Sequence, residues 1–188
     1  MYEDFSGKLS AFVLYDFSGI LLSSVITFLA YYSVVIVSLW DQDVRDDMIR
    51  IGCNPFNSDE SLVLKSAKVS FYKGQFVIKS NFAFTSHRSF SFGIMFLESS
   101  VKDTPYGRDV VRHEWGHFVQ LSIIGFSKFA LFYGVPSMLS VSNSYYFSLP
   151  WERSANLFGG VSGSNWTNPH TPNSDIYSIL YLIGILAF

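Results

Sequence analysis

The 188-residue sequence is poor in cysteine and in charged residues, and each shortage excludes a class of protein. Its single cysteine, Cys53, excludes an intrachain disulfide framework and a cysteine-rich zinc site, and we expect it to be a small buried side chain. Charged residues make up 15% of the chain and the net charge is −2, so the composition is not that of a nucleic-acid-binding protein. Apolar residues make up 49%, which excludes a disordered chain.

Residues Phe17–Trp40 contain no charged side chain across 24 positions. That length exceeds the roughly 20 apolar residues needed to cross a hydrocarbon core of about 30 Å, and Trp40 suits the interface between lipid and water. We therefore expect residues 17–40 to span or enter a membrane, behind a leader over residues 1–16. The alternative is a buried helix or hairpin, since five serines and one threonine dilute the run.

The remaining residues, 41–188, have the pattern of an α+β domain. Two β-branched and aromatic stretches, Ala67–Tyr72 and Gln75–Ser80, predict strands, and Lys73-Gly74 between them predicts a hairpin turn. Phe90–Leu97 predicts a further strand. We expect these strands to form a small sheet, with the last of them beside the functional cleft.

A helix is expected between Asp109, a plausible first-turn acid or N-cap, and Gly125, a plausible C-terminal stop. Its residues are apolar on nearly all sides, which predicts that this helix is buried in the core of the domain. Further elements are expected in this order: a helix over Ser127–Tyr133 interrupted by Gly134 and Pro136, a loop over Ser137–Ser148, a short helix from Pro150 to Gly159 with Ser148 as N-cap, a loop over Ser162–Ser174, and a buried terminal helix or strand over Ile176–Phe188.

The buried helix contains the motif HExxH at His113-Glu114-Trp115-Gly116-His117. Side chains four residues apart share one face of a helix, so His113 and His117 can present two imidazole nitrogens to one metal ion. Glu114 lies beside them, where its carboxylate can act as a general base on a water molecule at the metal. Polar side chains inside an apolar helix need partners, and Zn²⁺ is the natural partner for this pattern.

A catalytic zinc ion takes three protein ligands and leaves one position open. Downstream of His117 the candidates for a third ligand are Glu152, Asp175 and His170. Glu152 is the best of these, because it falls in the first turn of the short helix predicted after Pro150. Asn156 lies one turn later, where its side chain can orient a ligating imidazole by a hydrogen bond.

The segments that carry these residues resemble a known family. Asp109-Val-Val-Arg-His-Glu-Trp-Gly-His-Phe-Val-Gln, Val135-Pro-Ser and Trp151-Glu-Arg-Ser-Ala-Asn are similar to the zincin-like metallopeptidase domain at the C-terminal ends of bacterial Rhs-repeat and other polymorphic-toxin proteins. The run from Glu152 to Asn156 resembles the ExxA[DN] pattern of glutamate zincins. The similarity covers about residues 54–160. It implies a bacterial zinc hydrolase in which a small sheet packs on the HExxH helix and a second helix carries a glutamate ligand. With the apolar run over residues 17–40, we expect the protein to be membrane-bound or secreted.

The sequence thus predicts a zinc metallopeptidase that hydrolyses a peptide or protein substrate, with Glu114 as general base. The donor that stabilises the oxyanion stays open among four side chains: His170, Tyr133, Tyr145 and Tyr146. Two other functions also stay open. One is a non-catalytic membrane protein with a structural or degenerate zinc site, and the other is a membrane-inserting, toxin-derived effector. Nothing in the sequence supports an immunity partner.

Overall fold

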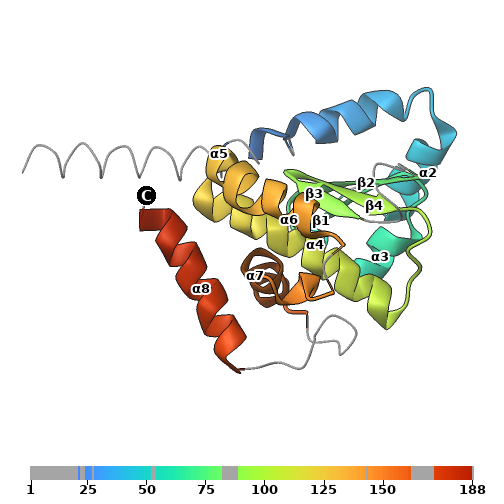
Figure 1. Ribbon diagram of the computed structural model, residues 1–188. Coiled ribbons are helices and arrows are strands. Elements are labelled where there is room, and N and C mark those ends of the chain that lie inside the picture. Colours follow the sequence, from blue (N-terminus) through green and yellow to red (C-terminus); the bar gives the residue numbers. More distant parts are fainter. Residues whose placement is uncertain are drawn as a thin grey trace, which may run out of the picture.

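The structure, a computed structural model, describes residues 21, 24–26, 28–51, 54–81, 89–142, 144–161 and 172–187. Its fold is α+β, as predicted: a small mixed sheet of four strands lies among helices, which make up most of the described chain (Figure 1). The predicted leader over residues 1–16, the cysteine at position 53 and His170 lie outside the described residues.

The predicted hairpin is confirmed as β1 (Val69–Tyr72) and β2 (Gln75–Ser80), which pair antiparallel. Lys73 and Gly74 both have positive φ, 46° and 83°, as a two-residue hairpin turn with the twist of its strands requires. The first strand starts two residues later than expected. The amides before it donate instead to the buried Asp47 carboxylate of α2 (Gln42–Ile51).

The single strand predicted over Phe90–Leu97 is wrong. Gly93 has φ 80°, a conformation that breaks an extended strand, and the chain turns back there. Two antiparallel strands result, β3 (Phe90–Phe92) and β4 (Ile94–Glu98), with Phe92 facing Ile94 across the turn. β4 also pairs parallel with β2, so the strand order is β1-β2-β4-β3.

Successive side chains of a strand point to opposite sides of the sheet. Helices cover both sides, so both faces of the sheet are buried. One face packs on the long helix α4 (Pro105–Ile124) and on α3 (Glu60–Lys65). The other packs on α2 and on the N-terminal helix Ser24–Val37. The buried apolar residues of the first face and its helices are Val63, Leu64, Tyr72, Val77, Met95, Leu97, Val110 and Val111. Those of the second are Val34, Val44, Phe71 and Phe76.

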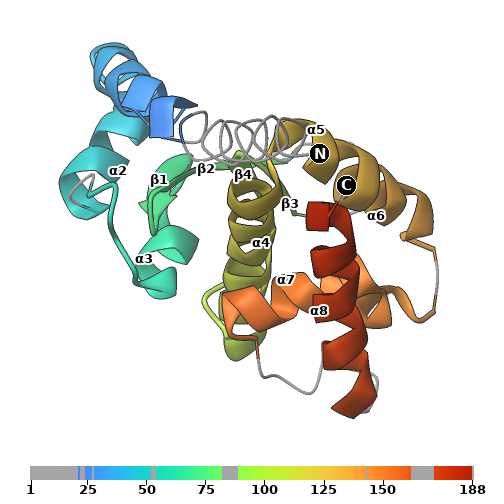
Figure 2. The same ribbon diagram turned by 90° about the vertical axis from the view of Figure 1, so that its left-hand side faces the viewer.

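Helix α4 is longer than predicted at its N-terminus and ends as predicted at Gly125. It starts at Pro105 rather than near Asp109, because Thr104 is the N-cap and its hydroxyl accepts the Gly107 amide at 3.1 Å. Proline in the first turn loses no helical hydrogen bond. The expected core position of the helix is confirmed, since α4 lies between the sheet and α7 (Figure 2).

The C-terminal third of the chain, after Gly125, is more helical than predicted. The break expected at Gly134 and Pro136 does not occur, because the chain passes through a π-helical turn and Pro136 falls in the first turn of the next helix. The short helix after Pro150 is confirmed, although its N-cap is Leu149 and not Ser148. The elements are α5 (Phe126–Phe129), η1 (Ala130–Gly134), α6 (Val135–Ser140), η2 (Tyr146–Ser148), α7 (Pro150–Gly159) and α8 (Pro172–Ala187).

Among the described residues, no single helix is both long and apolar enough to cross a membrane. Ser24–Val37 and Gln42–Arg50 pass that test only together, with a bend of 118° between them. Asp175–Ala187 is apolar but shorter. The membrane segment expected over residues 17–40 therefore stays a prediction.

Candidate metal centre

The predicted site residues come together where α4 crosses α7, and both helices present the same spacing. α4 contributes four buried residues at positions i, i+3, i+4 and i+7, which place them on one face: His113, Gly116, His117 and Gln120. α7 contributes four buried residues with the same spacing: Glu152, Ala155, Asn156 and Gly159. Two complementary stripes of small and polar residues thus face each other inside the molecule.

Two glycines let the helix backbones touch. A Cβ atom on Gly116 would lie 2.0 Å from the carbonyl oxygen of Ala155, and one on Gly159 would lie 2.2 Å from that of Arg112. Any side chain at either position would therefore push the helices apart. This close approach brings the short Glu152 side chain within reach of both histidines, so Gly116 is a structural requirement of the site inside the HExxH motif itself.

Three side chains converge on one point. The Oε2 atom of Glu152 lies 3.1 Å from Nε2 of His113 and 3.4 Å from Nε2 of His117. One ligand atom from each residue can be chosen so that all lie within 4.8 Å of one another, and all three residues are buried. The three predicted metal ligands are thus brought together as a group that can hold a metal ion.

The far nitrogen of each imidazole is fixed by an amide oxygen. Nδ1 of His113 lies 2.7 Å from Oδ1 of Asn156, and Nδ1 of His117 lies 2.8 Å from Oε1 of Gln120. The orientation of the Gln120 amide is set on its other side, because its nitrogen donates to the Trp151 carbonyl and to the Ser154 hydroxyl, both at 2.7 Å. An oxygen acceptor at Nδ1 places the imidazole hydrogen there and leaves the Nε2 lone pair directed at Glu152.

In this arrangement the Nε2 lone pairs of the two imidazoles face the carboxylate oxygens of Glu152. Such a set of electron-pair donors without donated hydrogens is what a metal ion requires. Neither carboxylate oxygen of Glu152 has a hydrogen-bond partner among the described residues, although the side chain is fully buried. A buried carboxylate without compensation is costly, and either a metal ion or a proton on an imidazole would compensate it. Two imidazoles and one carboxylate form a donor set that suits a divalent ion, and the residues fit.

Electrostatics leads to the same conclusion. Burial lowers the pKa of His117, but the Glu152 and Glu114 carboxylates and Gln120 outweigh it and raise that pKa to about 9. Burial raises the pKa of Glu152, but the two imidazoles more than offset this and hold it well below its ordinary value. Without a metal, a proton on His117 is therefore the cation that the Glu152 carboxylate requires.

Glu114 is the second buried carboxylate of the site, and it is not part of the ligand group. Its Oε2 atom has no hydrogen-bond partner among the described residues. Burial raises its pKa above the ordinary value, aided by Glu152 and opposed by the two histidines. Glu114 and His113 line a cleft of about 490 Å³, whose wall also includes Glu98, Tyr146 and Phe147. An acceptor with a raised pKa at the wall of a cleft is typical of a general base.

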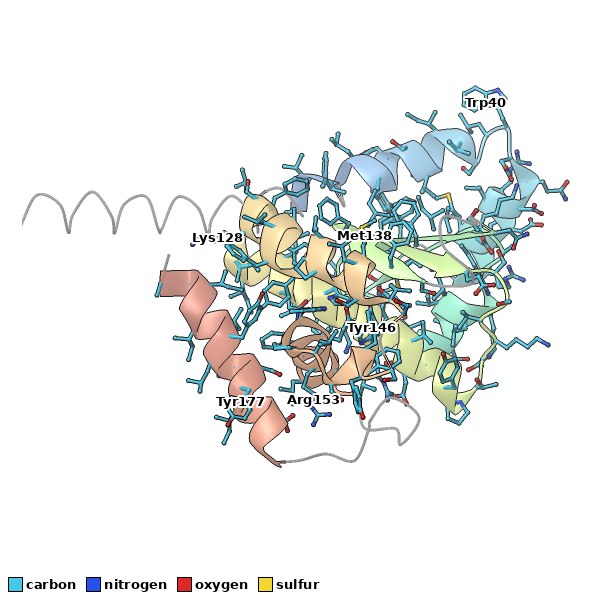
Figure 3. The ribbon with its side chains drawn as sticks, in the orientation of Figure 1. Trp40, Lys128, Met138, Tyr146, Arg153 and Tyr177 are labelled. Atoms are coloured by element: carbon cyan, nitrogen blue, oxygen red, sulfur yellow. The ribbon has the colours of Figure 1, made fainter. Side chains whose placement is uncertain are left out.

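The three tyrosines considered as oxyanion donors occupy different places. Tyr146 lines the cleft, and its hydroxyl lies 2.7 Å from Oγ of Ser137 on α6 (Figure 3). Burial, followed by the Glu152 carboxylate, raises its pKa, so the phenol is neutral and can donate. Tyr133 is buried against Phe129 in the helical core, and Tyr145 is exposed, so neither lines the cleft.

Two residues of the site were not predicted from the sequence. Gln120 fixes His117, and Ser154 in turn accepts from Gln120. Gln120 stands three residues after the second histidine, on the same helical face, and that spacing is the signal that could have revealed it. Arg112 turns away from the site and donates to the Glu60 carboxylate of α3 at 3.0 Å.

No protein-family model, no curated protein and no solved structure matches this chain.

Proposed function

We propose that this protein is a zinc-dependent peptidase in which His113, His117 and Glu152 hold the ion and Glu114 is the general base. One observation carries the proposal. A buried group of two imidazoles and a carboxylate lies beside a second buried carboxylate, that of Glu114, whose Oε2 atom has no hydrogen-bond partner among the described residues and which lines a cleft. The resemblance of the two helical motifs to zincin-like peptidase domains leads to the same function.

Zinc is the ion that best suits these donors. Zinc binds both imidazole nitrogen and carboxylate oxygen, whereas calcium and magnesium prefer six or more oxygen ligands. Three protein ligands leave a fourth position open, which is the arrangement of catalytic zinc sites. When bound, the ion would lower the pKa of a water molecule and polarise the carbonyl group of a substrate.

Other side chains would transfer the proton, orient the imidazoles and stabilise the oxyanion. Glu114 accepts a proton from the attacking water and returns it to the leaving amine, for which its raised pKa is suited. Asn156 and Gln120 keep the two imidazoles in one orientation and one tautomer. Tyr146, neutral and at the wall of the cleft, is the donor among the described residues best placed to stabilise an oxyanion.

The decisive variant is Glu114→Gln, which keeps the shape of the side chain but removes its ability to accept a proton. We expect hydrolysis of a denatured protein substrate to fall by about 10²–10⁴-fold, the usual contribution of a general base. Zinc content and thermal stability should stay near those of the wild type. Asp46→Asn, at an exposed acid of α2, is the matched control and should hydrolyse the substrate as the wild type does.

Glu152→Gln separates the base from the ligand, because it should lose zinc and activity together. Full activity of Glu114→Gln would disprove the assigned mechanism even if zinc is bound. A zinc-loaded wild-type protein that cleaves nothing across a broad peptide library would disprove the peptidase, and would leave a structural zinc site.

A further inference from the structure

The C-terminal third of the chain exposes large apolar side chains on two neighbouring units, α5–η1–α6 and α8. We call these side chains the apolar face: Phe126, Leu131, Val135, Met138, Leu139, Ile176, Tyr177, Ile179, Leu180 and Ile183. Met138 and Leu139 are 72% and 79% exposed, and α6 has no buried residue. On α8 the exposed positions 176, 179, 180 and 183 recur at helical spacing, so the outer side of this helix is apolar.

The two units lie side by side. Leu182 and Ile185 of α8 are buried against Phe129 and Tyr133. The Tyr181 hydroxyl donates to the carbonyl of Phe132 at 2.8 Å. In Figure 2 the helices α5, α6 and α8 stand together on one side of the molecule, whereas α2 and α3 stand on the other. The two units that carry the apolar face are therefore neighbours in the fold.

Charge is almost absent from the C-terminal third of the chain, residues 126–188. The sequence has 13 Lys and Arg and 15 Asp and Glu, and only four of them lie after residue 125: Lys128, Glu152, Arg153 and Asp175. Each of the four has a partner inside the molecule. Lys128 donates to the carbonyl of Ile185 at 3.2 Å, Glu152 belongs to the metal group, and Arg153 pairs with Asp175 (Figure 3). The four charges are thus all paired within the molecule and none belongs to the apolar face, although the Asp175 side chain is 35% exposed.

From this charge distribution we infer that the apolar face docks on a lipid bilayer, with α6 and α8 lying against the headgroups and their apolar side chains entering the hydrocarbon. Surfaces in contact with water normally carry about 25–35% charged residues, and protein interfaces keep a polar rim around their apolar centre. A hydrocarbon phase disfavours charge, and residues 126–188 carry only four charged side chains, each with a partner inside the molecule. Tyr177, 65% exposed, projects from α8 and adds an amphipathic aromatic of the kind found at membrane interfaces (Figure 3).

Docking of the apolar face on a bilayer requires neither zinc nor hydrolysis. Because the apolar run 17–40 could attach the chain to a bilayer by itself, the experiment must distinguish that run from the apolar face. The native cysteine of the full chain is replaced by serine, and one new cysteine is introduced at Met138, at Leu180 or at Ile49. Each carries an environment-sensitive fluorophore. Ile49 on α2 is the matched control, because it is 75% exposed and apolar but lies outside the face.

The labelled chains are mixed with phosphatidylcholine vesicles. We expect labels at positions 138 and 180 to brighten several-fold, to be quenched by nitroxide lipids and to be protected from iodide in the water. The label at position 49 should stay accessible to iodide. Adding Leu139→Glu should return the label at 138 towards water, because a carboxylate resists entry into hydrocarbon.

Three results would overturn the inference. The vesicle-bound protein could keep the labels at 138 and 180 in water, which would mean that another segment attaches it. These labels could be shielded without vesicles and exposed again on dilution, which would mean that a second copy of the chain covers the face. The protein could also fail to bind vesicles. Circular dichroism and the melting temperature of each labelled chain must match those of the parent, so that no result reflects misfolding.

Discussion

Two regions of the molecule differ in how their side chains are packed: the α4–α7 contact and the apolar face. At the contact, small and polar residues let two helices approach closely, and the imidazole and amide groups are held in one arrangement. On the apolar face, large side chains project outwards and touch few neighbours. A substitution at the α4–α7 contact displaces neighbouring atoms, whereas the apolar face should tolerate exchange of one apolar side chain for another. Chemistry is expected at the first and association at the second.

The sharpest test of this contrast compares the same substitution in both regions. Gly116→Ala places a methyl group against a backbone carbonyl at 2.0 Å, so we expect it to lower the free energy of unfolding by about 3 kcal/mol and to abolish metal binding. Gly184→Ala on α8 meets no atom within 4 Å and should stabilise the protein by about 0.5–1 kcal/mol through helix propensity. Urea denaturation measures both. Equal effects of the two substitutions would mean that the helices do not touch as described.

A smaller effect is expected from the amide that holds His117. Gln120→Ala removes the acceptor at Nδ1, so we expect zinc affinity to fall by about 10–100-fold. Competition with a chromophoric chelator measures it. Gln42→Ala makes the same chemical change at an exposed position of α2 and should leave the affinity unchanged. An unchanged affinity in Gln120→Ala would show that the imidazole needs no support.

The α3–α4 contact, between Glu60 and Arg112, is neither as tightly packed as the α4–α7 contact nor as exposed as the apolar face. It predicts that the stability of the fold depends on pH. Burial raises the pKa of Glu60, but hydrogen bonds from Tyr72 and Arg112 outweigh it and hold that pKa below the ordinary value of 4.5. A carboxyl with a lowered folded-state pKa stabilises the fold above pH 4.5 and loses that contribution as the pH falls through the lowered value. Glu60→Gln should therefore destabilise the protein by about 1–2 kcal/mol at pH 7 and by much less at pH 3. Denaturation curves at the two pH values decide it, and a constant difference would contradict the assigned network.

Local sequence signals predicted the elements that depend on neighbouring residues. The turn at Lys73-Gly74 and the helix stop at Gly125 are properties of short segments, and both are confirmed. The turn at Gly93 was missed, because alternating aromatic residues continue on both sides of it. The helix through Pro136 was missed for a similar reason, since its π-helical turn has no sequence signature.

The ligand group was predictable because histidine and acidic residues are scarce downstream of the motif and leave few combinations. What holds that group together was not. The contact at Gly116 depends on a carbonyl of another helix, and the role of Gln120 depends on Trp151 and Ser154, so both require the packing of α4 on α7. The exposed apolar side of α8 was also missed, because an apolar run does not reveal which of its sides is buried.

The measurement that tests the central claim most directly is the zinc content of the purified full chain, by elemental analysis after dialysis against a weak chelator. We expect one zinc ion per chain in the wild type, and its loss in His117→Ala and in Glu152→Gln. Loss of a ligand should also lower the melting temperature, because metal binding stabilises the folded state. No zinc in the wild type, or equal zinc in His117→Ala, would contradict the assignment of His113, His117 and Glu152 as a metal centre.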